Sequence, residues 1–308
     1  MSRIVVTGAT GTIGRAVCRG LKARGDQVVA LSRDRERAQE ALDDQVEIYI
    51  WAEPTGQMPP AEALTSADAI IHLLGEPVSQ RWSHDAKARI RDSRVYATRM
   101  LVAALGELPE PARPAVLVCG SATGLYGPSD ARELDESAPA GSDFLASVVH
   151  EWEAEATAAA DLTRVVITRT GVVLSSSGGS LEKMLPFFRM GVGGPVGGGR
   201  QYVPWIHLDD VVAGLLFCVQ HPELAGPVNL TAPAPVTNAE FSHALGRVLH
   251  RPAAFPVPAP ALRVLYGEMA QIVTTGQRVV PRRLSEAGFK FRHPDLEPAL
   301  RDVLTAPG

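Results

Sequence analysis

The sequence predicts an α/β protein with a doubly wound parallel sheet and a smaller, α-rich C-terminal cap domain. Apolar runs alternate with segments of helical periodicity throughout residues 1–174. This alternation indicates right-handed βαβ crossovers and hence a parallel sheet. A glycine-rich turn follows the first apolar run directly, and the alternation ends after Leu174. These three observations separate a sheet-based core from a C-terminal part that is built differently.

The core strands are expected where short apolar runs are rich in β-branched residues. The first run leads into the glycine turn, and the others are Gln27–Leu31, Val46–Ile50, Ala69–Leu74, Ala115–Cys119 and Arg164–Thr168. Helical periodicity is clearest over Asp85–Leu108 and Asp143–Ala160. Ligands of such sheets bind beyond the carboxyl ends of the strands, so function is expected in the loops that follow these runs.

The remaining residues are expected to divide between the core and the cap. Residues 1–174 form the predicted nucleotide-binding core, and residues 206–230 are expected to return to it. Residues 175–205 and 231–308 are expected to build the substrate-binding cap, including a small C-terminal domain. Within the cap, residues 186–201 contain six glycines and two prolines, a composition typical of a surface loop.

Further elements are expected in the C-terminal part. Tyr202–Ile206 resembles a strand and Leu208–His221 a helix. The four prolines of Pro252–Pro260 indicate a linker, and a helix is expected over Ala261–Thr275.

The glycine turn has the features of a dinucleotide-binding site, spaced GxxGxxG after a strand and before a helix. Gly8 permits the tight turn, Gly11 permits close approach of a pyrophosphate, and Gly14 permits close packing of helix on sheet. The phosphates then meet free N–H groups at the helix N-terminus. This Rossmann-type arrangement is favoured over an ordinary glycine-rich turn. The cofactor-binding residues predicted here are Gly8, Thr10, Gly11, Thr12, Ile13 and Gly14.

The end of the second strand indicates which dinucleotide binds. A carboxylate usually stands about 20 residues after the glycines of NAD-selective folds and accepts hydrogen bonds from the ribose. Here Ser32 and Arg33 offer donors and a positive charge, which suit the 2′-phosphate of NADP(H). The alternative is a solvated, charged helix start, since Asp34 and Glu36 alternate with Arg33, Arg35 and Arg37.

Three later strand ends contribute further predicted cofactor contacts. The fourth strand ends in Leu73, Leu74, Gly75 and Glu76, Ser121 follows the fifth strand, and Gly171 follows the Arg164–Thr168 run. Gly75 leaves room for a ribose against the backbone, whereas Glu76 is equally well an exposed loop carboxylate. His72 lies among aliphatic residues and is expected to be a packed core histidine.

Composition argues against several classes of partner. The chain of 308 residues carries a net charge of −4, which argues against nucleic acid and anionic membranes. No apolar run reaches the length of a membrane span. Cys18, Cys119 and Cys218 lie far apart in apolar segments, which predicts buried thiols in place of disulfides or metal ligands. We expect a cytoplasmic monomer or homodimer that binds a small-molecule substrate and no metal.

Several segments together resemble the extended short-chain dehydrogenase/reductase superfamily. They are the glycine turn, Leu73-Leu74-Gly75, the run Gly120-Ser121-Ala122-Thr123-Gly124-Leu125-Tyr126-Gly127 and Trp205-Ile206-His207-Leu208-Asp209-Asp210. Arg81-Trp82, Met184-Leu185-Pro186, Gly276-Gln277-Arg278 and Ala287-Gly288-Phe289 are similar to an atypical branch, the epimerase family proteins (YfcH-like). These proteins have a C-terminal domain of unknown function. The resemblance implies NADP(H) binding and a role in epimerisation, reduction or dehydration.

The tyrosine and lysine that this superfamily uses for proton transfer are missing. They are spaced YxxxK on the helix after the fifth strand, and Phe144 and Val148 stand at the matching positions. Neither side chain can transfer a proton. General acid–base help contributes roughly 10²–10⁴-fold, so catalysis with a substitute group is not excluded.

Ser121, Thr123 and Tyr126 are the candidate catalytic residues. The resemblance gives Ser121 a hydrogen bond to the substrate oxygen, although its hydroxyl would equally well satisfy the loop backbone. Tyr126 is the nearest phenol by sequence, and a structural role is favoured for it. His207 is a weaker candidate, and Asp209 and Asp210 are expected to complement a helix dipole and to link the two domains.

Two functions are compatible with this pattern. The first is an NADP(H)-binding oxidoreductase or epimerase-like enzyme for a small sugar-like or carbonyl substrate, with Arg200 and Arg278 as the first cap residues to test. The second is a non-catalytic NADP(H) sensor or binding protein. The sequence carries no nucleophile elbow, HExxH, CxxC or P-loop pattern.

Overall fold

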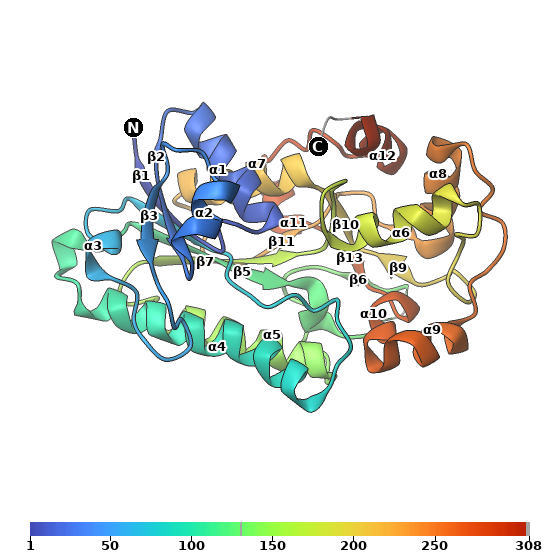
Figure 1. The fold of residues 1–308 in the computed structure, drawn as a ribbon, viewed down its shortest axis with the longest axis horizontal. Coiled ribbons are helices and arrows are strands. Elements are labelled where there is room, and N and C mark those ends of the chain that lie inside the picture. The colour runs from blue at the N-terminus through green and yellow to red at the C-terminus, as the bar shows by residue number, and fades with distance from the viewer. Residues whose placement is uncertain (130, 306–308) are drawn as a thin grey trace.

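The computed structural model describes residues 1–129 and 131–305. Its main sheet has seven strands in the order β11-β7-β5-β4-β1-β2-β3 (Figure 1). All neighbouring strands of this sheet pair in parallel, which confirms the predicted fold class. The strands are β1 (Arg3–Thr7), β2 (Gln27–Ser32), β3 (Glu47–Ile50), β4 (Ala69–His72), β5 (Val116–Ala122), β7 (Arg164–Thr170) and β11 (Gly226–Leu230).

Helices cover both faces of this sheet. The helices α1 (Thr12–Ala23) and α7 (Leu208–Gln220) lie on one face, and α4 (His84–Glu107) and α5 (Phe144–Thr157) on the other (Figure 1). Successive residues of β1 point to opposite faces, so Val6 belongs to the core under α1 and α7, and Val5 to the core under α4 and α5. Burial on both faces explains why these strands are continuous apolar runs.

Short elements complete the chain, and most of them lie at the cap side of the sheet (Figure 1). The minor strands are β6 (Glu133–Leu134), β8 (Val172–Leu174), β9 (Tyr202–Val203), β10 (Trp205–His207), β12 (Val236–Thr237) and β13 (Arg278–Val279). The other helices are α2 (Arg35–Ala41), α3 (Ala61–Leu64), α6 (Gly179–Arg189), α8 (Asn238–Leu249), α9 (Ala259–Tyr266), α10 (Gln271–Thr274), α11 (Arg282–Glu286) and α12 (Leu296–Thr305), with 3-10 turns η1 (Glu110–Ala112), η2 (Thr123–Tyr126) and η3 (Gly267–Ala270).

Two expected elements are interrupted for identifiable reasons. The strand expected over Tyr202–Ile206 divides at Pro204, which has no N–H to donate, and its halves β9 and β10 pair with β12 and β8. The helix expected over Ala261–Thr275 stops at Gly267, whose φ of +62° lies in the left-handed region. The chain then continues as η3 and α10.

The cap has a core of its own. Buried side chains of α6, α8 and α12, among them Leu185, Phe241 and Leu300, pack together. Strand β11 lies outside this core and pairs with β7, so the chain returns to the main sheet between two cap segments. Among the described residues, no helix combines the length and apolarity needed to cross a bilayer.

The cysteines are buried free thiols, as predicted. Cys18, Cys119 and Cys218 lie within the core of the sheet. Burial raises the pKa of each thiol to about 12. At neutral pH they are therefore neutral and act as small apolar side chains.

Candidate functional site

The parallel sheet brings the predicted site residues to one edge, because parallel strands share the direction of their carboxyl ends. Gly8–Gly14 follow β1, Ser32 ends β2 with Arg33 directly after it, and Leu73–Glu76 follow β4. Ser121 lies near the end of β5, and Gly171 connects β7 to β8. The order of the strands reverses between β1 and β4, so this edge contains the topological switch point.

Gly8 and Gly14 lie where a Cβ would meet backbone atoms, and the approach of a pyrophosphate to Gly11 stays a prediction. Gly8 has a φ of +65°, and a Cβ on it would lie 2.6 Å from the carbonyl oxygen of Leu73. A Cβ on Gly14 would overlap the carbonyl oxygen of Gly8, which in turn accepts a hydrogen bond of 3.0 Å from the N–H of Gly11. Gly11 is exposed, and its backbone is open to a ligand on the outer side.

At the end of β2, the side chains of Ser32 and Arg33 differ in whether they already have a partner within the chain. Ser32 Oγ donates to the carbonyl oxygen of Asp34 at 2.9 Å, so this hydroxyl shapes the turn. Asp34 Oδ1 accepts from the N–H of Arg37 and caps α2. The side chain of Arg33 is exposed beside this cap. The contact of Arg33 with a phosphate stays a prediction.

Beyond β4 the chain passes over a guanidinium that the sequence did not single out. Gly75 is exposed, and a Cβ on it would lie 2.9 Å from Cζ of Arg94. Arg94 Nη1 donates to the carbonyl oxygens of Glu76 and Ile90, each at 2.9 Å. Burial lowers the pKa of Arg94 to about 10, which leaves it charged at neutral pH. Arg94 thus supports the loop that holds Leu73–Glu76.

Gly171 packs against the neighbouring chain. Its N–H donates to the carbonyl oxygen of Leu230 at 3.0 Å, and a Cβ on it would overlap the carbonyl oxygen of Pro204. Glycine is therefore needed here for close approach of two backbones. The contact with a cofactor stays a prediction.

Ser121 is held by a buried ion pair. Its Oγ donates to Glu153 Oε1 at 2.6 Å. Arg169 donates to the same carboxylate with Nε and Nη2, each at 2.8 Å. Both side chains are largely buried, so the pair is rigid and desolvated. The serine proton points to Glu153, which leaves the lone pairs of Oγ to accept a hydrogen bond from a ligand.

Tyr126 belongs to the same network and is fully engaged in it. Its hydroxyl accepts from Arg169 Nη1 at 3.0 Å and donates to Asn229 Oδ1 at 2.7 Å. Burial raises the pKa of the phenol. These contacts favour a structural role, as the sequence did. Thr123 is buried at the start of η2.

The positions of the missing tyrosine and lysine are filled by apolar packing. The ring of Phe144 meets Trp82 edge-to-face at 5.2 Å between centroids, and Lys87 Nζ lies 5.1 Å from the Phe144 centroid. Lys87 is itself paired with Glu268 of the cap. Val148 is buried. No side chain at these two positions can exchange a proton.

His72 is a core histidine, as predicted. Thr7 Oγ1 lies 2.7 Å from Nδ1, and Thr98 Oγ1 lies 3.1 Å from Nε2. The side chain is fully buried, which lowers its pKa to about 4. It is therefore neutral at physiological pH.

His207, Asp209 and Asp210 join the core to the C-terminal segment. Asp210 accepts from the N–H groups of Arg292 at 2.7 Å and His293 at 2.9 Å. His207 Nδ1 accepts from the N–H of Asp209 at 3.0 Å and so caps α7. The expected link between the two parts of the chain is thus present.

His207, Asp209, His293 and Asp302 place potential metal-ligand atoms within 4.8 Å of one another. Since Nδ1 of His207 accepts a hydrogen bond, Nε2 carries the proton of the neutral ring. That nitrogen lies 3.3 Å from Asp302 Oδ2, and the ring stacks on His293 at 3.7 Å. A metal-bound histidine normally has the opposite arrangement, with its other nitrogen donating. This geometry favours a histidine–carboxylate contact between domains.

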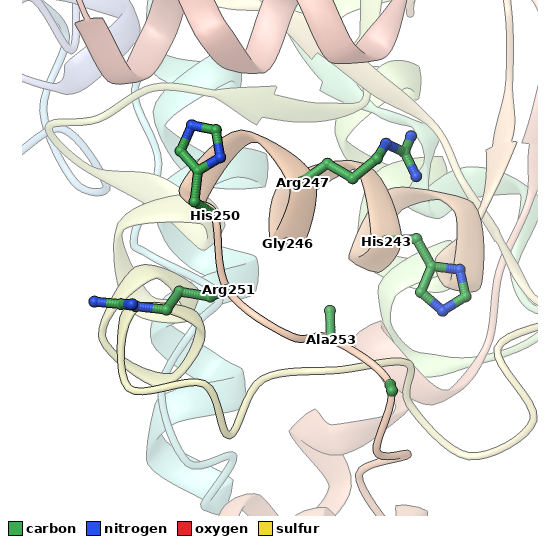
Figure 2. Close-up of a pocket in the computed structure, with 7 residues that line it drawn as sticks. His243, Gly246, Arg247, His250, Arg251 and Ala253 are labelled. Atoms are coloured by element: carbon green, nitrogen blue, oxygen red, sulfur yellow. The ribbon is translucent and has the colours of Figure 1, made fainter.

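The two cap residues selected from the sequence lie outside the hydrogen-bond network of Ser121, Glu153 and Arg169. Arg278 Nη2 lies 3.6 Å from Glu133, and its guanidinium lies over the ring of Tyr202, while Arg200 is exposed. An open hollow of about 550 Å³ lies against α8 and the loop that follows it. Figure 2 shows that the basic side chains around it point away from one another. They do not converge on a ligand.

Sequence reasoning missed Arg94, Glu153 and Arg169. The sequence does indicate Arg169, because it directly follows the apolar run Arg164–Thr168, and a charge buried there needs a partner of opposite charge. Glu153 is one of three glutamates on α5, and Arg94 is one of four arginines on α4. Only the packing of those helices distinguishes them.

Relatives match this chain over nearly its whole length. Residues 4–230 match the NAD dependent epimerase/dehydratase family, and residues 257–303 match a domain of unknown function, DUF1731. The epimerase family protein SDR39U1 homolog, chloroplastic, of Arabidopsis thaliana is 40% identical over 303 residues, which cover 98% of this chain and 86% of that protein. Human epimerase family protein SDR39U1 is 36% identical over 307 residues, 98% of this chain and 99% of that protein.

Solved structures agree with these matches. The crystal structure of human epimerase family protein SDR39U1 (isoform2) with NADPH has a TM-score of 0.87 at 34% identity, covering 98% of both chains. UDP-glucuronic acid 4-epimerase from Bacillus cereus in complex with NAD has a TM-score of 0.77 at 14% identity, covering 97% of this chain and 96% of that one. The second likeness concerns the fold alone.

Proposed function

Because the chain belongs to the NAD dependent epimerase/dehydratase family, we propose that it is an NADP(H)-dependent oxidoreductase or epimerase-like enzyme. Its substrate is a small sugar-like or carbonyl compound. The human relative crystallised with NADPH supports this choice of cofactor. The exposed guanidinium of Arg33 and the lack of a carboxylate at the end of β2 also support it.

The residues of the glycine turn fit a dinucleotide. The exposed backbone of Gly11 and the N-terminus of α1 would hold the phosphates. Gly8 and Gly14 permit the tight turn that places them, because a Cβ on either residue would meet backbone atoms. Arg33 would pair with the 2′-phosphate. When bound, the nicotinamide supplies or accepts a hydride. The chain's own residues supply binding and orientation.

The observation that carries an enzymatic function is the buried contact between Ser121 and Glu153. The strand ends of β4 and β5 are adjacent, so Ser121 lies beside the loop that is predicted to contact the cofactor. Ser121 Oγ donates its hydrogen bond to Glu153 Oε1 at 2.6 Å. Oγ therefore orients a hydroxyl of the substrate by accepting its hydrogen bond, which is a positioning role.

The alternative function, an NADP(H) sensor without catalysis, is favoured by Phe144 and Val148. Both leave the usual proton-transfer positions apolar. A sensor needs cofactor binding and the cap, and it has no need of an ordered serine hydroxyl. Ser121→Ala therefore separates the two functions.

The test is turnover with saturating NADPH or NADP⁺ against a panel of carbonyl compounds, alcohols and sugar nucleotides. The enzyme hypothesis predicts a product that wild-type protein forms, and that Ser121→Ala forms at least about tenfold more slowly when it is saturated with NADPH. Wild-type protein that binds NADPH and forms no product from the panel would favour the sensor. Absence of NADPH binding would refute both.

A further inference from the structure

Two loops of the cap carry large apolar side chains on their outer surface. Met190 and Val192 follow α6 and are 66% and 60% exposed, and Phe255 follows α8 and is 74% exposed. Both helices lie at the end of the molecule opposite α3 (Figure 1). Exposed apolar side chains that gather in one place mark an interaction site.

The two loops form a single surface. Arg251 Nε donates to the carbonyl oxygen of Arg189 at 3.0 Å. The N–H of Val257 donates to the carbonyl oxygen of Pro195 at 2.7 Å, so the loops also lie side by side further along. We call this surface the cap tip, and it consists of residues 189–192 and 251–255.

The apolar side chains of the cap tip are held outwards by their neighbours. Phe188 and Ala253 are 3% and 8% exposed and belong to the cap core. Each loop is thus anchored from below, while Met190 and Phe255, two residues further along their loops, face the solvent. Their exposure is therefore a fixed property of the fold.

The sequence on both sides of the cap tip is basic. Residues 183–208 and 241–267 together contain six lysines and arginines and no aspartate or glutamate. The net charge of −4 is an average over the whole chain and conceals this uneven distribution. A second copy of the chain would bring the same positive charge to this surface. The cap tip therefore fits an anionic partner and repels its own copy.

The basic side chains are spread out and do not converge. His243, Arg247, His250 and Arg251 line the hollow beside the cap tip, and Figure 2 shows that they point away from one another. A single phosphate group would require donors that converge on it. Positive charge spread around protruding apolar side chains suits an array of anionic lipid head groups instead, since the apolar side chains can insert between them.

We propose that the cap tip docks on the surface of an anionic lipid bilayer. Met190, Val192 and Phe255 insert among the head groups, and Arg189 and Arg251 pair with lipid phosphates. The inference does not depend on the proposed cofactor or reaction, because none of these residues belongs to the predicted cofactor site. Added salt should weaken the docking, because it screens the arginines.

Sedimentation with vesicles tests the proposal on the full chain. Wild-type protein should sediment with vesicles of equal parts phosphatidylcholine and phosphatidylglycerol, and far less with phosphatidylcholine alone. Phe255→Ala should weaken binding about tenfold through lost apolar burial, and Arg189→Gln about fivefold through one lost charge. The matched controls are Met58→Ala, half-exposed before α3, and Arg19→Gln, exposed on α1. Both should bind as wild-type protein does.

Fluorescence reports whether the cap tip itself enters the lipid. The four native tryptophans, at positions 51, 82, 152 and 205, are all buried. Phe255→Trp adds one at an exposed position. Its emission should shift to shorter wavelength with the anionic vesicles and should be quenched by brominated lipid. Met58→Trp, at the other end of the molecule, should show neither change.

The outcomes separate the possible occupants. Sedimentation that fails, or that is equal with both kinds of vesicle, would overturn the proposal and leave an acidic protein as the partner that fits the cap tip. Sedimentation in which Phe255→Trp shows no spectral change would also overturn it, because another surface would then hold the lipid. Loss of binding in both control variants would show a response that is not specific to the cap tip.

Discussion

Ser121 Oγ and Glu153 Oε1 are joined by a 2.6 Å hydrogen bond, and the same carboxylate is paired through both oxygens with Arg169. This relationship links the end of β5 to α5 and to the end of β7. It gives the serine hydroxyl a single direction, because the proton is directed to a carboxylate that can only accept. The site therefore presents an acceptor where the superfamily resemblance implied a donor to the substrate oxygen.

Removal of the carboxylate should cost more stability than removal of a similar one nearby. Glu153→Ala leaves the buried guanidinium of Arg169 without its partner, which should lower the free energy of unfolding by about 3–5 kcal/mol. Glu151→Ala on the same helix breaks a half-exposed pair with Arg91 and should cost about 1 kcal/mol or less. Urea denaturation of the two variants makes the comparison. Equal losses would contradict a buried, rigid pair.

The glycines of the turn should respond differently to the same substitution. Gly14→Ala places a Cβ on the carbonyl oxygen of Gly8, so we expect a loss of roughly 3 kcal/mol in unfolding free energy. A Cβ on Gly11 meets only Gly8 O, at 3.3 Å. Gly11→Ala should therefore fold normally and lose NADPH affinity, as thermal melts and fluorescence titration would measure. Unchanged NADPH affinity in folded Gly11→Ala would argue against phosphates at this backbone.

Arg33 should determine the preference for the phosphorylated coenzyme. Arg33→Ala removes a charge-assisted contact with the 2′-phosphate, so NADPH affinity should fall about 10–100-fold. NADH lacks that phosphate and should bind nearly as it does to wild-type protein. Calorimetric titrations with both coenzymes test this, with Arg19→Ala on the exposed side of α1 as control. Equal losses for NADPH and NADH would refute the assignment.

His72 should make the protein less stable in acid. Burial holds its pKa at about 4 in the folded chain, against about 6.5 when unfolded. Between these values the unfolded chain binds the extra proton, so stability falls as pH drops from 6.5 towards 4, by about 3 kcal/mol in all. The stability contributed by the neutral His72 side chain is fully present above pH 6.5.

Urea midpoints across this pH range test the contribution of His72. The pH dependence of unfolding should be shallower in His72→Gln than in wild-type protein. His84→Gln replaces a side chain that is 98% exposed and should leave the slope unchanged. A His72→Gln slope equal to that of wild type would show that this histidine is not the titrating group.

Much of the fold was readable from local patterns in the sequence. The alternation of apolar runs and helical segments predicted the parallel sheet, and the expected helix Asp85–Leu108 differs from α4 by one residue at each end. The glycine turn was equally readable. Gly14 is required by backbone atoms a few residues away, and Gly8 by the backbone that follows the neighbouring strand. The packing of His72 followed from its apolar neighbours.

The partners of the site residues depended on the tertiary structure. Glu153 is one of three glutamates on α5 and Arg94 one of four arginines on α4. Only the packing of these helices on the sheet brings Glu153 to Ser121 and Arg94 to Gly75. The hydrogen bonds from Lys183 Nζ to Ser79 likewise join segments that are far apart in the sequence. Backbone periodicity is a local property that a sequence carries by itself, whereas a buried charge finds its partner only when distant segments meet.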